Sequence, residues 1–210
     1  MPKVTFFNLP EDKRATLILS LKKEFSRVPL YDASISNIVK AAGIPRGSFY
    51  QYFEDKEDAF FFILNDFVAC INHQFFTLIK KYNGDLFDTM QEFFQIIIEE
   101  EENVHFFRNA FLNMTYRIES TFSRIFKEHE TNNNLKVLSS LLNTSILNFS
   151  SEEELNHLLQ IISAVTFRNI VEKFAKELPN EEALRRYRLE LTLLKSGLVR
   201  HLERESRGTS

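Results

Sequence analysis

Residues 34–53 read SISNIVKAAGIPRGSFYQYF, and this stretch decides the fold. Ser34 is a favourable N-cap for a short helix with one apolar face. Gly43 ends that helix, because glycine adopts the left-handed conformation at a helix C-terminus at little cost. Pro45 suits the first turn of a second short helix, which the pattern predicts to run to about Phe53. Two short helices joined by a tight glycine turn form a helix-turn-helix.

In a helix-turn-helix the second helix lies in the major groove of DNA, and its predicted exposed side chains suit that position. Arginine can donate two hydrogen bonds to a guanine edge, glutamine can pair with adenine, and serine and tyrosine hydroxyls reach phosphates. Phe49 and Phe53, four residues apart, are expected to pack inside the domain instead. Arg46 is the first choice for reading bases. The residues expected to contact DNA are Ser34, Arg46, Gly47, Ser48, Tyr50, Gln51, Tyr52 and Lys56.

One predicted helix precedes the helix-turn-helix, and much longer helices follow it. Pro10 opens the preceding helix and Pro29 ends it. Asp55 caps a helix that continues to the turn at 83–84, and its almost uninterrupted apolar sequence indicates burial on several sides. Asp85 starts the next helix, and residues 104–129 are expected to form one or two more.

The final third of the chain predicts two long helices. Ser151 and Glu154 form a capping box that opens the first, and Pro179 separates it from the second, where apolar residues step by three and four as in a heptad seam. Two such helices can form half of a four-helix bundle completed by a second subunit, or pack only on the chain's own core. We expect the homodimer, with an interface made by Leu158, Ile162, Val165, Leu184, Tyr187, Leu191, Leu194 and Leu198.

The composition indicates an all-α protein. Only 5 Gly and 5 Pro occur in 210 residues, too few for a turn-rich β protein, and 44% hydrophobic residues are too many for disorder. Residues 1–56 carry nine Lys/Arg and six Asp/Glu, a net charge of +3, whereas the remainder carries 17 and 23, a net charge of −6. A nucleic-acid site is therefore confined to the N-terminal part. We predict a three-helix DNA-binding domain at 1–55, a larger helical effector-binding and dimerisation domain at 56–205, and a disordered tail at 206–210.

Residues 13–57 resemble the TetR/AcrR family of transcriptional regulators. The resemblance rests on AGI at 42–44, RGSFYQYF at 46–53 and KE at 56–57. Pro29 and Pro45 stand where the family usually has glycine and serine. The resemblance implies a ligand-responsive regulator, in most cases a repressor, that binds palindromic operator DNA as a homodimer. It also implies that a small molecule entering the middle helices releases the DNA.

The middle helices supply the candidate effector site. Their apolar side chains, with few polar neighbours, are typical of a ligand pocket between helices and equally of a filled core. As a pocket they favour a small hydrophobic or aromatic effector. The candidate lining residues are Phe67, Ile71, Phe94, Ile97, Phe107, Phe111, Met114 and Phe122. Two other functions stay open, a helical carrier of an apolar ligand without a DNA role and a regulator without ligand control; the basic N-terminal part disfavours the carrier.

The sequence indicates neither catalysis nor metal binding. The 5 His residues lack metal-binding spacing, the 1 Cys gives no thiolate cluster, and no phosphate-cradling glycine motif occurs. We therefore expect no enzyme activity, no cofactor and no metal. The N-terminus has no apolar signal segment and the chain has no uncharged apolar run of about 18 residues, so no membrane association is expected. A cytoplasmic protein is the prediction, and a single cysteine suits a reducing compartment.

Overall fold

The computed structural model describes residues 1–100, 103–112, 118, 121 and 134–198, and these form helices and no strand. The all-α prediction is thereby confirmed. In chain order the elements are α1 (Val4–Phe7), α2 (Glu11–Arg27), the 3-10 helix η1 (Leu30–Asp32), α3 (Ile35–Ala42), α4 (Arg46–Tyr52), α5 (Lys56–Lys81), α6 (Leu86–Glu99), α7 (Val104–Leu112), α9 (Asn134–Leu141), the 3-10 helix η3 (Thr144–Ile146), α10 (Glu152–Ala175) and α11 (Asn180–Leu198).

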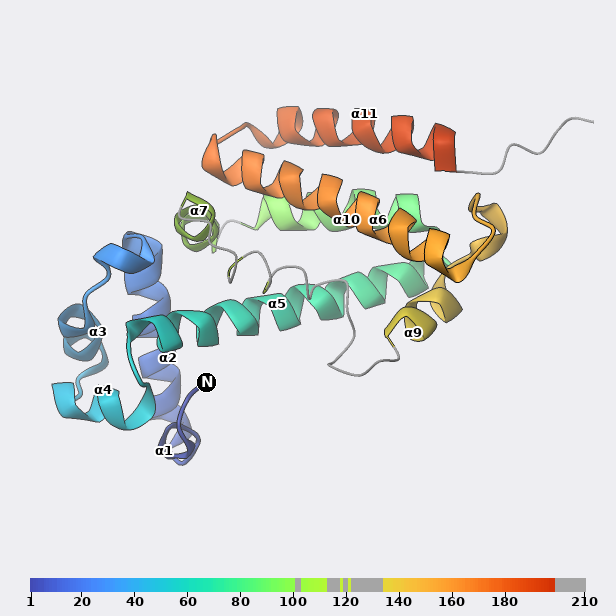
Figure 1. Ribbon diagram of the computed structural model, residues 1–210. Coiled ribbons are helices and arrows are strands. Elements are labelled where there is room, and N and C mark those ends of the chain that lie inside the picture. Colours follow the sequence, from blue (N-terminus) through green and yellow to red (C-terminus); the bar gives the residue numbers. More distant parts are fainter. Residues whose placement is uncertain (101–102, 113–117, 119–120, 122–133, 199–210) are drawn as a thin grey trace, which may run out of the picture.

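Helices α1 to α4 gather at one end of the molecule, which we call the head (residues 1–53; Figure 1). Its core is made by apolar residues from α1 to α4 together with the residue that follows α4. Phe49 and Phe53 are fully buried, as their spacing predicts. Leu21 and Phe25 from α2 and Ile38 from α3 meet them in the same core. Because the apolar side of each short helix faces inward, the opposite side of α4 is exposed to solvent and accessible to a partner.

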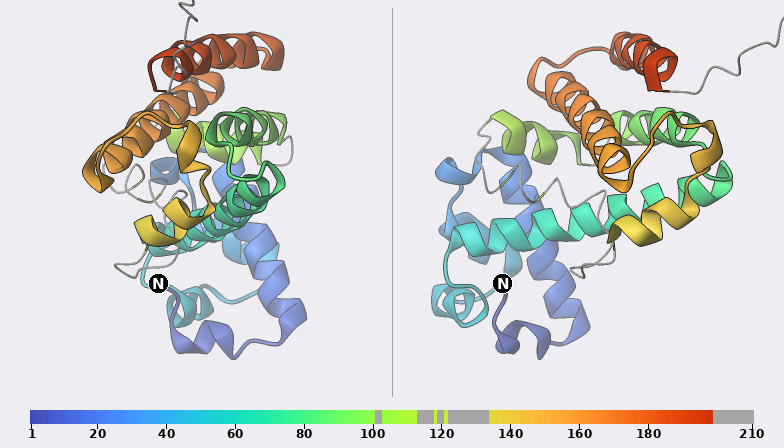
Figure 2. Two further views of the ribbon diagram at one scale, coloured as in Figure 1. Left: turned by 90° about the vertical axis from the view of Figure 1, so that its right-hand side faces the viewer. Right: turned by 45° about the vertical axis from the view of Figure 1, so that its right-hand side comes forward.

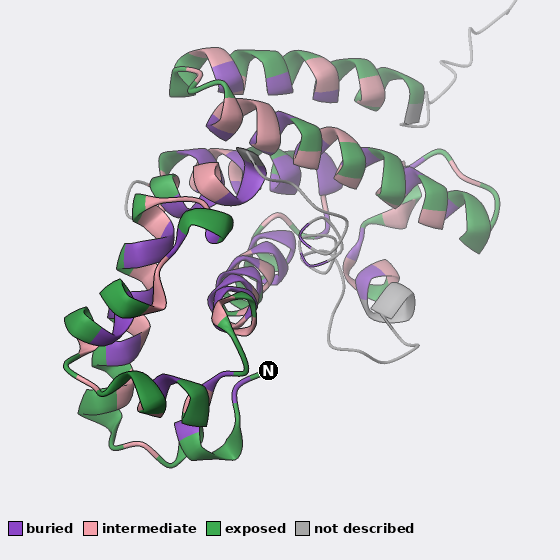
Figure 3. Cartoon of the chain, turned by 60° about the vertical axis from the view of Figure 1, so that its left-hand side comes forward, coloured by how far each residue is buried: buried purple, intermediate pink, exposed green. Residues whose placement is uncertain are grey.

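Helix α5 is a rod that starts at the head and runs along the larger part of the molecule (Figure 1). The Asp55 carboxylate accepts a hydrogen bond from the Asp58 amide at 2.7 Å, the cap that the sequence predicts. Its 26 residues extend about 39 Å at the α-helical rise of 1.5 Å. Figure 3, which views α5 almost end-on, shows buried residues around much of it. By length and composition alone α5 could cross a membrane, but a core helix of a water-soluble protein has the same character.

Helices α6, α10 and α11 are stacked on one side of α5 (Figure 1). Helix α6 contacts α5 and also contacts α10 and α11, which pack on each other farther from α5 (Figure 2). Helix α7 contacts both α10 and α2. The described part of α7 therefore joins the head to the C-terminal helices.

The predicted heptad seam is largely covered within a single chain, which corrects the sequence-based interface. Tyr187 stacks on Phe94 of α6 with ring centroids 4.1 Å apart, and its hydroxyl lies 2.7 Å from that of Thr166. Burial raises the pKa of Tyr187. The four seam residues buried in the chain's own core are Leu158, Ile162, Tyr187 and Leu191. Val165, Leu184 and Leu194 are half-buried, and the side chain of Leu198 lies outside what the structure describes.

Most helix ends follow the predicted signals. Ser151 caps α10 by accepting from the Glu154 amide at 3.1 Å, and Asp85 caps α6 by accepting from the amides two and three residues later. The sequence missed α1, which is only four residues long. The predicted pocket residues Met114 and Phe122 and the predicted tail 206–210 lie outside the described residues.

Candidate nucleic-acid interface

The turn between α3 and α4 has the geometry that its glycine predicts. Gly43 has φ +65° and ψ +30°, the left-handed conformation, and the Ile44 amide donates to the Val39 carbonyl at 3.0 Å. Pro45 is extended and directly precedes the first residue of α4. Both departures from the family pattern, Pro29 and Pro45, stand at helix boundaries where proline costs little.

The outer face of α4 presents the residues predicted to read DNA. Arg46, Gly47, Tyr50 and Gln51 are exposed, whereas Ser48 and Tyr52 are half-buried. Apart from the two neighbouring residues and the helix's own backbone, no described atom lies within 4 Å of the position where a Cβ on Gly47 would stand, so the α4 backbone is open to close approach there. Hence one face combines a guanidinium, an amide, a phenol and an unobstructed stretch of backbone, as major-groove recognition requires.

A buried carboxylate that the sequence analysis missed holds α3 in place. Glu24 of α2 is 5% exposed, and its oxygens accept from Arg27 (2.8 and 3.0 Å), from the Ser34 amide (2.8 Å) and from Asn37 Nδ2 (3.2 and 3.4 Å). The hydrogen bond from Arg27 lowers the pKa of Glu24, and the Ser34 and Asn37 bonds act the same way against the opposing effect of burial. Ser34, half-buried at the N-cap of α3, makes no side-chain capping bond. Glu24 caps α3 from outside the helix.

Lys56 has a different environment from the one the sequence predicted. Its ammonium group donates to the backbone carbonyls of Tyr31 and Ala33, which flank the end of η1. It thus joins the start of α5 to the segment before α3. The sequence could not show this, because a lysine side chain suits a phosphate and a backbone carbonyl equally well.

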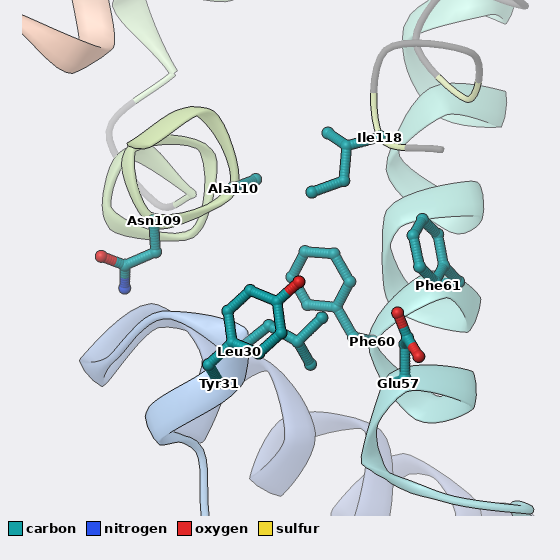
Figure 4. A pocket seen from close by; sticks show the side chains of 8 residues that line it. All are labelled: Leu30, Tyr31, Glu57, Phe60, Phe61, Asn109, Ala110 and Ile118. Carbon is teal, nitrogen blue, oxygen red and sulfur yellow. The ribbon is translucent and has the colours of Figure 1, made fainter. Parts of the chain in front are cut away.

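Asn109 is a second residue that the sequence analysis missed, and it joins α7 to the head. Its Nδ2 atom donates to the carbonyls of Phe25 and Ser26, at the C-terminal end of α2, at 3.0 and 2.9 Å. A small hollow opens beside this contact, and its enclosed part has room for about one water molecule. Figure 4 shows its lining from η1, α5 and α7 with Ile118: Leu30, Tyr31, Glu57, Phe60, Phe61, Asn109, Ala110 and Ile118.

The candidate effector residues are closely packed in this conformation. Phe107 lies between Phe67 (5.4 Å between ring centroids), Phe111 (6.2 Å) and Phe174 (5.6 Å). All six candidates within the described residues are buried: Phe67, Ile71, Phe94, Ile97, Phe107 and Phe111. None of the six lines the hollow beside Asn109. The described candidates are thus buried and in contact with one another, and effector binding among them stays a prediction.

Within the described ranges, no group of three or more His, Cys, Asp or Glu is arranged to hold a metal ion. The exposed polar face of α4 is the candidate functional site of the described residues.

Two family models match the chain. Residues 18–61 match the model described as bacterial regulatory proteins, tetR family, and residues 85–198 match a tetracyclin repressor-like C-terminal domain. Over 56 residues the chain is 41% identical to the uncharacterized HTH-type transcriptional regulator YdgC of Bacillus subtilis (strain 168). That alignment covers 27% of this chain and 29% of YdgC.

Solved structures share the fold along almost the whole chain. The fatty acid degradation regulator FadR from Bacillus halodurans has a TM-score of 0.63 at 14% identity over 90% of this chain and 97% of its own. The dihydroxyacetone kinase operon activator DhaS has a TM-score of 0.59 at 17% identity over 90% of this chain and 98% of its own. The second family model alone spans more than half of the 210 residues. The chain belongs to the TetR family of bacterial regulatory proteins and is a helix-turn-helix transcriptional regulator.

Proposed function

We propose that the protein is a ligand-responsive repressor that binds palindromic operator DNA as a homodimer in the cytoplasm. The observation that carries the proposal is the exposed face of α4, where Arg46 and Gln51 stand clear of the head's core. Arginine and glutamine are the side chains that discriminate guanine and adenine edges in the major groove. Each subunit would present one α4 to one half-site, with half-sites about one helical turn or a small multiple apart.

The proposed domain division places DNA binding in residues 1–55 and effector binding and dimerisation in 56–205.

The outward faces of α10 and α11 favour the dimer. Ile161, Leu189 and Leu193 are exposed in the single chain, at 46%, 57% and 65% respectively. A second copy that covers these side chains would bury apolar surface that is now in water. The half-buried Val165 and Leu194 remain part of the proposed interface.

The proposed effector is a small hydrophobic molecule that binds among the aromatic residues of α5, α6 and α7. Since those side chains are packed together here, an effector would have to separate them. Helix α7 is the element through which this movement would reach the head, because Asn109 is hydrogen-bonded to the end of α2.

The first test is selection of fragments of the native genome by the purified protein, followed by titration of a selected fragment and of random DNA of equal length. The proposal predicts a palindromic sequence in the selected fragments and much tighter binding to them. Binding of both DNAs with the same affinity would contradict operator recognition, and binding of neither would leave an apolar-ligand carrier as the better description.

The effector is tested by reciprocity. A molecule that lowers operator affinity by some factor must bind more weakly to the operator complex by that same factor. Genes beside the selected fragments suggest compounds to try. Calorimetry with equal compound affinity in the presence and absence of operator would exclude that compound as an effector.

A further inference from the structure

Helix α4 needs support from outside itself. It has seven residues, one of which is Gly47, and it has no side-chain N-cap bond. A helix this short does not persist alone, and glycine lowers its stability further. The Phe49 carbonyl accepts from the Phe53 amide at 2.9 Å, but the carbonyls of Tyr50, Gln51 and Tyr52 lack partners within the helix, because an α-helix leaves its final carbonyls unpaired.

Residues near the start of the chain supply three of those partners. The Lys3 backbone amide donates to the Tyr52 carbonyl at 2.8 Å, and the Lys3 ammonium group donates to the Tyr50 carbonyl at 2.8 Å. The Thr5 hydroxyl donates to the Gln51 carbonyl. The carbonyl end of α4 is thus capped by a segment more than 40 residues earlier in the sequence.

The same segment is anchored in the core of the head. Phe6, 1% exposed, has its ring centroid 5.2 Å from that of Phe53, 5.0 Å from that of Phe62 in α5 and 6.5 Å from that of Tyr52. Pro2 is also buried. The capping donors are therefore fixed relative to both α4 and α5, and they do not belong to a loose arm.

We propose that residues 2–7, here named the N-terminal cap, position α4 for reading DNA, with Lys3 and Thr5 as the positioning residues. This inference rests on the proposed operator binding, and it extends the DNA-binding unit beyond residues 18–61 matched by the family model. Without the cap, the last turn of α4 loses its carbonyl partners and frays. Gln51, within that turn, then loses the orientation on which base recognition depends.

The cap is tested with the double variant Lys3→Met, Thr5→Val and the matched control Lys13→Met, Thr16→Val. The control removes one exposed lysine and one hydroxyl from α2 of the same head, where the Thr16 hydroxyl bonds only to its own helix turn, at Asp12. The variant Lys3→Arg, Thr5→Ser retains both side-chain donors. All three are compared with the intact protein.

The first readout is amide hydrogen exchange without DNA, which tests the cap even if no operator is found. We expect the α4 amides to exchange about tenfold faster in the double variant, which corresponds to about 1.4 kcal/mol. Exchange in α5 to α11 should not change, and the control and the donor-retaining variant should match the intact protein. Unchanged α4 exchange in the double variant would overturn the proposal.

The second readout is DNA affinity at fixed salt. The double variant should bind selected operator about tenfold more weakly than the control does, with a much smaller difference on random DNA. Equal losses on both DNAs would show that Lys3 acts only through its charge and would overturn the positioning role. Failure of the intact protein to prefer any DNA would refute the proposed function, whereas the exchange result would still decide the cap.

Discussion

Replacement of Glu24 by glutamine tests how the head is held together, because the change preserves shape, removes the charge and replaces one acceptor oxygen by an NH2 donor. Hydrogen bonds to a charged group contribute about 1 kcal/mol more than neutral ones. Glu24 makes such bonds with the Ser34 amide and with Asn37. Its pair with Arg27, whose side chain is 53% exposed, is screened by solvent and contributes little. We therefore expect Glu24→Gln to lower the free energy of unfolding by about 2 kcal/mol.

The pH dependence of this difference has a definite sign. The pKa of Glu24 is lowered in the folded state from its ordinary value of 4.5, first by the hydrogen bond from Arg27. A carboxyl group with a lowered folded pKa contributes stability that is complete above its unfolded pKa and is lost as the pH falls through its folded pKa. The stability difference between intact protein and Glu24→Gln should thus be constant above about pH 4.5 and shrink below it.

The assay is urea unfolding followed by circular dichroism from pH 3 to 7, with amide exchange of α3 to assign the loss to the head. Glu54→Gln serves as the control, since Glu54 is an exposed carboxylate of the α4–α5 connection. Carboxylates other than Glu24 and Glu54 are present in every variant, so their contributions to the pH dependence of stability cancel in the comparison. Equal stability of intact protein and Glu24→Gln at pH 7, or a difference that does not vary between pH 3 and 7, would refute this account.

Three further changes test separate contacts. Lys56→Met should lower the free energy of unfolding by about 1–2 kcal/mol, because two backbone carbonyls lose a charged donor. Unchanged stability together with a weaker salt dependence of DNA binding would instead make Lys56 a phosphate contact. Tyr187→Phe should lower the free energy of unfolding, measured in urea, by about 1–2 kcal/mol, because the buried hydrogen bond to Thr166 is lost. Unchanged stability would mean that this bond is energetically neutral. Leu189→Asp should give a folded monomer by light scattering, because Leu189 is exposed in the single chain, whereas Leu191→Asp should unfold the protein, because Leu191 lies in the core. A dimer that survives Leu189→Asp would place the interface elsewhere.

The parts of the fold that local chemistry decides could be predicted from the sequence. Gly43, Asp55 and Ser151 stand at helix boundaries because a left-handed glycine and a capping oxygen act on neighbouring backbone groups. The same holds for Phe49 and Phe53, whose spacing alone fixes the inner face of α4. Local signals of this kind identify an element without knowledge of the rest of the chain.

Contacts between distant elements could not be predicted in the same way. An apolar stripe shows which side of α11 is buried but not what covers it, and Tyr187 packs on α6 of its own chain where a second subunit was expected. Glu24 and Lys56 have ordinary surface-type side chains, and only the fold shows that each bonds to backbone groups in another element. Neither type of partner leaves a periodic signal in the sequence.

Base reading by α4 is tested most directly by the affinity of Arg46→Ala for a selected operator and for random DNA at one salt concentration. A bidentate contact to a guanine contributes about 1–3 kcal/mol, so operator binding should weaken about 5- to 150-fold. Binding to random DNA should change much less, because only the charge of Arg46 matters there. Equal weakening on both DNAs would contradict base reading by Arg46.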